Sequence, residues 1–160
     1  MKKFLTITAL VAVVIVISLL IFDVYRTGEY SKRIDQIQME VRPTEVTVNG
    51  EKMMNVKITV SGELPTEPVN VIIFTDNRYL EFPANKVVTE PGVTYAGRQA
   101  GGTEAVFSLS SEFDGEFSVD YLIKRNSDHT PLVYAFVKGK INNYLLGDES
   151  FSTGIFQVKD

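Results

Sequence analysis

The chain has 160 residues, with 16 basic and 20 acidic side chains, one His and no Cys. Its formal net charge of −4 at pH 7 argues against a nucleic acid partner, because nucleic acids are bound mainly by Lys and Arg on phosphates. Without Cys there is no disulfide framework or thiol nucleophile, and a single His excludes a multi-histidine zinc or copper centre.

An uninterrupted apolar stretch opens the chain. No charged residue lies between Phe4 and Phe22, and this length approaches the roughly 20 helical residues that cross a hydrocarbon core of about 30 Å. A secretory signal would have a shorter apolar region and a small-x-small cleavage site, whereas Leu19 to Tyr25 is bulky. We therefore predict a retained transmembrane helix over residues 4–22, surrounded by membrane lipid.

Basic residues flank both ends of this stretch, at Lys2, Lys3, Arg26, Lys32 and Arg33. The two lysines directly abut the apolar residues, which favours a cytoplasmic tail at residues 1–3. Residues 23–34 are polar and indicate a juxtamembrane linker or a short helical extension. The expectation is a single-pass protein of the cell membrane, with residues 35–160 outside the cytoplasm.

The hydrophobic period changes to two after the polar segment. Ile37, Met39 and Val41 alternate with polar residues, as in a half-buried strand, and Asn49-Gly50 is a strong hairpin signal. The run "PVNVIIFT" is typical of a central strand covered on both faces. Further short apolar runs alternate with turn clusters, so residues 35–160 are predicted to form an all-β antiparallel sandwich of about seven to nine strands.

One stretch resembles the bend that leads into strand F of immunoglobulin-like domains. In "LSSEFDGEFSV" the residues are Asp114, Gly115, Phe117 and Val119, with Phe and Val at the usual Tyr and Cys positions. The resemblance implies an immunoglobulin-like sandwich without the tyrosine corner. An apolar helix joined to a sandwich also resembles single-pass proteins of the archaeal cell envelope, including those that tether the archaellum motor to the surface layer. That likeness implies a role in binding other proteins.

Three stretches superficially suggest chemistry. "GRQAGGT" at 97–103 lacks the Lys of a phosphate-binding loop and is interpreted as a long β connection. "NSDHT" at 126–130 places Ser, Asp and His side by side, whereas a catalytic triad converges from separate elements, so a turn is predicted. Acidic residues at 112–116 and 148–149 match no calcium-loop spacing and are interpreted as solvated turn charges. No catalytic, cofactor-binding or metal-binding residue is predicted.

Three tyrosines are predicted to lie in connections between strands: Tyr79, Tyr95 and Tyr144. A tyrosine in such a position can anchor a partner surface, although packing of the loop itself is the simpler use of the ring. The sequence thus favours a noncatalytic, membrane-anchored domain that binds a protein partner in the envelope or in a membrane complex.

Two alternatives remain open at this point. One is an accessory subunit of a membrane enzyme complex. The other is a pilin-like filament subunit, since "MKKFLTITALVAVVIVISLL" resembles a pilin stem. Two positions depart from that pattern, because Lys3 stands where a leader peptidase usually needs Gly and Thr8 stands where bacterial pilins have Glu.

Overall fold

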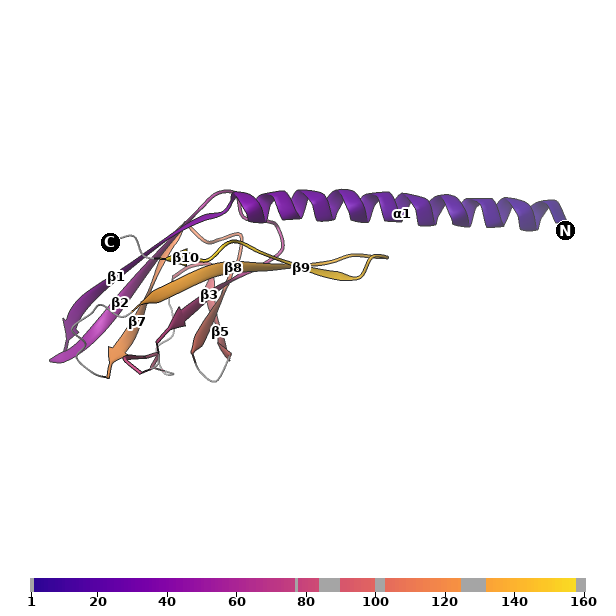
Figure 1. Cartoon of the computed structure of the whole chain (residues 1–160). Helices are drawn as coiled ribbons and strands as arrows, with labels where there is room; N and C mark the ends of the chain where they lie inside the picture. The colour runs from indigo at the N-terminus through magenta and orange to yellow at the C-terminus, as the bar shows by residue number, and fades with distance from the viewer. Residues whose placement is uncertain (1, 77, 84–89, 100–102, 125–131, 158–160) are drawn as a thin grey trace.

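The computed structural model of the protein describes residues 2–76, 78–83, 90–99, 103–124 and 132–157. These residues form one long helix and ten strands, arranged as an elongated β domain from which the helix projects (Figure 1). The elements are α1 (Lys2–Gln36), β1 (Gln38–Val48), β2 (Glu51–Ser61), β3 (Val69–Thr75), β4 (Leu80–Glu81), β5 (Val93–Gln99), β6 (Glu104–Leu109), β7 (Glu116–Ile123), β8 (Val133–Asn142), β9 (Asp148–Ser152) and β10 (Phe156–Gln157).

Helix α1 is a single continuous rod of 35 residues, about 52 Å long at 1.5 Å per residue. Its most apolar window has a mean hydropathy of 2.9, which suffices for a membrane span by length and composition. The apolar side chains between Ile7 and Tyr25 are exposed on all sides rather than covered by the domain. A helix that buries one face in a soluble core would instead keep a polar stripe on the other face.

The strands form two antiparallel sheets. One has the order β1-β2-β7-β4, and the other has the order β10-β8-β3-β6-β5 with β9 also paired to β8. The predicted antiparallel β-sandwich preceded by one apolar helix is confirmed. Eight of the strands in the described residues have five or more residues, in line with the expected seven to nine.

The first hairpin follows its sequence signal. Asn49 and Gly50 both have positive φ, at 53° and 83°, and Val48 pairs with Glu51 across them. This is the conformation of a two-residue turn that matches the twist of the strands. Strand β1 passes through Pro43, which a ladder tolerates here because β1 is an edge strand.

The core lies between the two sheets. Strand β3 is central in its sheet and buried on both faces, as its apolar run predicts. Phe117 and Val119 of β7 point inward, and Gly115 before them has φ of 108° and accepts a 2.8 Å hydrogen bond from the amide of Val60. Two residues of α1, Tyr30 and Ile34, are also part of this core.

Candidate functional site

Tyr79 and Tyr95 are half-buried and pack against the core. Tyr95 lies within β5, which corrects its expected place in a connection, and its ring centroid is 4.9 Å from that of Phe82. Tyr79 lies in the turn before β4, where the Arg78 guanidinium is 5.6 Å from the Tyr79 ring centroid. Both rings therefore serve packing at least in part.

Tyr144 is placed differently, with 68% of its side chain exposed. It lies at the tip of the β8–β9 hairpin, in a turn closed by a 3.2 Å hydrogen bond from the Asn143 amide to the Gly147 carbonyl. Leu145 and Leu146 follow it and are also exposed. The hairpin runs along α1 towards the N-terminus (Figure 1), so its tip is separate from β5, which carries Tyr95.

One face of the C-terminal half of α1 contacts this hairpin. The contact residues recur every three or four positions, the spacing that puts side chains on one face of a helix. They are Asp23, Arg26, Thr27, Tyr30 and Ile34. We call this contact the helix–hairpin junction.

Asp23 forms the end of the junction nearest the apolar part of α1. Its carboxylate accepts hydrogen bonds from the backbone amides of three consecutive turn residues, Tyr144 at 3.1 Å, Leu145 at 2.6 Å and Leu146 at 3.3 Å. The Asp23 side chain is fully buried by these contacts. Charge-assisted hydrogen bonds of this kind are stronger than neutral ones, and here they fix the hairpin tip beside one turn of the helix.

Arg26 and Thr27 extend the polar contacts. The guanidinium of Arg26 donates to the carbonyl of Asn142 at 3.0 Å and to the Glu67 carboxylate at 2.5 Å. The Asn143 side-chain amide donates to the Thr27 hydroxyl at 2.9 Å. Burial alone would raise the pKa of the Glu67 carboxyl, but the hydrogen bond from Arg26 and the charges of Arg26 and Arg33 lower that pKa by more.

Tyr30 and Ile34 form the apolar end of the junction. They lie on Gly139 of β8, and the Tyr30 ring centroid is 5.8 Å from that of Phe151 in β9. A Cβ at residue 139 would meet the Tyr30 hydroxyl and would lie 2.8 Å from Cδ1 of Ile34. The absence of a side chain at this position therefore lets the helix approach the strand closely.

A cleft of about 300 Å³ lies beside the junction, just beyond the apolar part of the helix. Aromatic and charged side chains of α1, the loop before β3 and one residue of β8 line this cleft: Phe22, Tyr25, Arg26, Glu29, Tyr30, Arg33, Pro65, Thr66, Glu67 and Ile141. Arg26 and Arg33 are paired with carboxylates, at Glu67 and Glu63 respectively. The charge within the cleft is thus largely compensated.

The junction was not apparent from the sequence. Residues 23–34 offered a polar linker or a helical extension, and in the structure they are helical. The only signal was the apolar pair Tyr30 and Ile34, one turn apart within polar surroundings. Asp23 gave no sign that it would accept hydrogen bonds from residues more than 120 positions later in the chain.

The stretches that superficially suggested chemistry are described only in part. Gly97 to Gln99 belong to β5, after a β-bulge that follows Tyr95, so the stretch 97–103 is in part a strand rather than a connection. Residues 100–102 and 126–130 lie outside the described part of the chain. Within that part, no group of three or more His, Cys, Asp or Glu side chains is placed to hold a metal ion.

No known protein family matches this chain, and no curated protein matches it. One solved structure with a similar fold is a chain from the crystal structure of a type I cohesin–dockerin complex from Clostridium thermocellum. The two chains are 14% identical with a TM-score of 0.39, over 76% of this chain and 98% of the other. A likeness of this degree assigns neither a family nor a function to this chain.

Proposed function

We propose that this protein is a noncatalytic, membrane-anchored β-sandwich that binds a protein partner in the cell envelope or in a membrane complex. The observation that carries the proposal is the exposed apolar half of α1, which projects from the domain as one rod (Figure 1). Exposed apolar side chains on every face of a helix need an apolar environment, and a bilayer provides one over this length.

The same helix that would span the membrane is also part of the folded domain. Tyr30 and Ile34 are core residues, and they lie two to three turns beyond Phe22. The domain is therefore held in a fixed orientation relative to α1 rather than on a loose tether. A partner in the same layer then meets it at an effective concentration that can reach about millimolar, so a modest interface suffices.

The test of the anchor is fractionation of cells that express the full chain. The protein should stay with membranes after washing at alkaline pH, and added protease should digest the β domain only from the outer face. Release by the alkaline wash would contradict the anchor. Digestion only after membranes are opened would contradict the orientation. Crosslinking in intact cells should then recover a stable protein partner attached to the β domain.

A filament subunit is the second candidate, and one observation favours it. In a filament, the exposed apolar half of α1 could be covered by the same half of neighbouring copies instead of by lipid. N-terminal sequencing of the protein from cells separates the two: a new N-terminus at Phe4, together with filaments on the cell surface, would support the filament. An unprocessed start at Met1 or Lys2 supports the anchor.

A further inference from the structure

The tip of the β8–β9 hairpin exposes three consecutive apolar residues, although a turn between two strands is normally polar. Tyr144, Leu145 and Leu146 are 68%, 46% and 44% exposed. They are bounded by polar residues on both sides, with Asn142 and Asn143 before them and Gly147, Asp148 and Glu149 after them. A short apolar tip with polar shoulders is suited to shallow insertion into an apolar layer.

The height of this tip along α1 is fixed by direct contacts. Three amides of the tip donate to Asp23, the first charged residue after the apolar stretch. The ring of Tyr144 lies beside that of Phe22, the last apolar residue before Asp23, with centroids 6.1 Å apart. The tip therefore lies level with the end of the apolar part of the helix.

We propose that the hairpin tip formed by Tyr144, Leu145 and Leu146 inserts into the outer interface of the same bilayer that α1 spans. The inference rests on the proposed membrane anchor and adds a second membrane contact to it. Once α1 spans the bilayer, a tip tied to Asp23 must meet the interface, where a tyrosine with an apolar ring and a polar hydroxyl is favoured. The polar shoulders limit the insertion to these three residues.

Two membrane contacts constrain the domain more than one does. A single helix that crosses the bilayer leaves the domain free to tilt together with the helix. A hairpin tip in the interface on one side of the helix fixes which side of the domain faces the membrane. The sheet faces and loops left accessible to a partner are then set by the chain itself.

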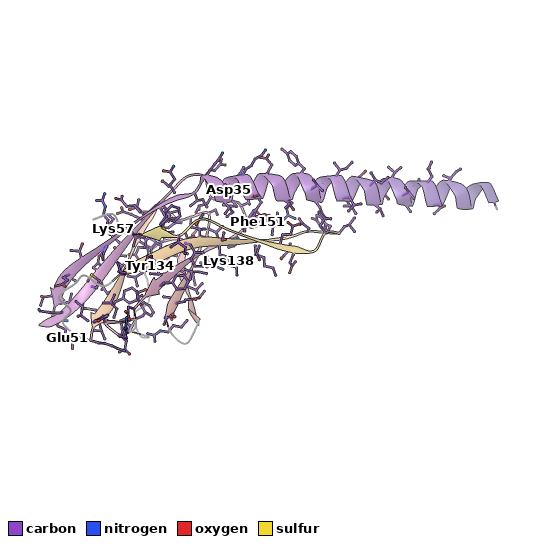
Figure 2. All side chains as sticks on the ribbon, in the orientation of Figure 1. Asp35, Glu51, Lys57, Tyr134, Lys138 and Phe151 are labelled. Atoms are coloured by element: carbon purple, nitrogen blue, oxygen red, sulfur yellow. The ribbon has the colours of Figure 1, made fainter. Side chains whose placement is uncertain are left out.

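The experiment uses the full chain in phosphatidylcholine vesicles and takes advantage of the absence of native Cys. A single Cys replaces Leu145 and carries an environment-sensitive fluorophore, which is quenched by lipids with a nitroxide at the headgroup or deep in the acyl chain. Val14→Cys, in the middle of the apolar stretch, reports on the anchor. Glu51→Cys lies at the end of the domain away from α1 (Figure 2) and is the matched control for a label that stays in water.

The label at 145 should be quenched about twofold more by the headgroup nitroxide than by the deep one, as for a group about 5–10 Å into the interface. The label at residue 51 should be quenched by neither nitroxide, and the label at residue 14 should be quenched by the deep nitroxide. Quenching at 14 without quenching at 145 would overturn the inference and leave the anchor intact. Loss of quenching at 14 would overturn the anchor itself. A label at Leu146 repeats the test if the Leu145 variant does not fold.

Discussion

Replacing Gly139 by Ala tests whether the helix is truly part of the folded domain. Gly139 lies in the middle of β8, where its backbone conformation suits any residue. The only penalty comes from the added methyl group, which would meet the Tyr30 hydroxyl, with Cε1 of Tyr30 at 2.9 Å and Cδ1 of Ile34 at 2.8 Å. Carbon atoms so close must move apart, so the helix must shift away from the hairpin.

The cost follows from the packing of these residues. Adding a methyl group to a closely packed core typically destabilises a protein by about 1–3 kcal/mol. Tyr30 and Ile34 are 3% and 0% exposed, so little free space is available to relieve the contact. For a domain of this size, each kcal/mol lowers the melting temperature by roughly 3–5 °C, so a loss of about 3–15 °C is expected.

The assay is thermal unfolding of the full chain in detergent, monitored by the circular dichroism signal of the β domain. Gly154→Ala is the matched control, because a Cβ there meets nothing within 4 Å. Adding Tyr30→Phe to Gly139→Ala removes the hydroxyl that the methyl meets and should restore part of the loss. If Gly139→Ala unfolds at the same temperature as the control, the helix does not pack on β8 as described.

Three other predictions concern the sandwich. Gly92→Ala should destabilise the sandwich by at least about 2 kcal/mol, measured by denaturant titration. The reason is that φ at residue 92 is 73° and the new Cβ would lie 2.7 Å from the backbone Cα of Phe113. Unchanged stability would contradict this backbone conformation. Ile58→Glu should leave the domain unfolded by circular dichroism, since an unpaired charge in the core costs several kcal/mol, and a native spectrum would refute the placement of Ile58 in the core. Burial raises the pKa of Tyr121, and its hydroxyl has no hydrogen-bond partner among the described residues. The unfolded chain therefore loses this proton first, and stability falls as pH rises above about 10. Tyr121→Phe should change the free energy of unfolding little at pH 7 and should reduce the loss of stability above pH about 10. An equal loss of stability at alkaline pH in both proteins would contradict this role of Tyr121.

Local patterns predicted most of the fold. The alternation of Ile37, Met39 and Val41 placed three buried residues correctly, because a half-buried strand puts every second side chain inward. Asn49-Gly50 set the first turn, since both residues accept positive φ. These signals work because each depends on residues within a few positions of one another.

Local sequence patterns did not predict the contacts between segments that lie far apart in the chain. Thr27 and Asn143, which share a hydrogen bond, are 116 residues apart, and nothing local to either residue indicates the other. The polarity of residues 23–34 indicated only a linker or a short helical extension, although Arg26 and Thr27 contact the hairpin. The sequence predicted Tyr144 in a connection between strands, but its contacts with Phe22 and Asp23 of α1 are visible only in the structure.

In the proposed anchored protein, the rigid link between α1 and the β domain makes the kind of partner testable. Each Ala inserted between Val14 and Ile15 rotates the N-terminal part of the helix by about 100° and leaves the junction unchanged. A partner that binds only the external domain should still crosslink to variants with one, two or four inserted residues, and this is the result we expect. A partner that also contacts the helix within the membrane should no longer crosslink to the variants with one or two inserted residues. Its crosslinking should largely return with four inserted residues, which come close to one full helical turn. That periodic loss would contradict binding by the external domain alone and would point to an intramembrane complex.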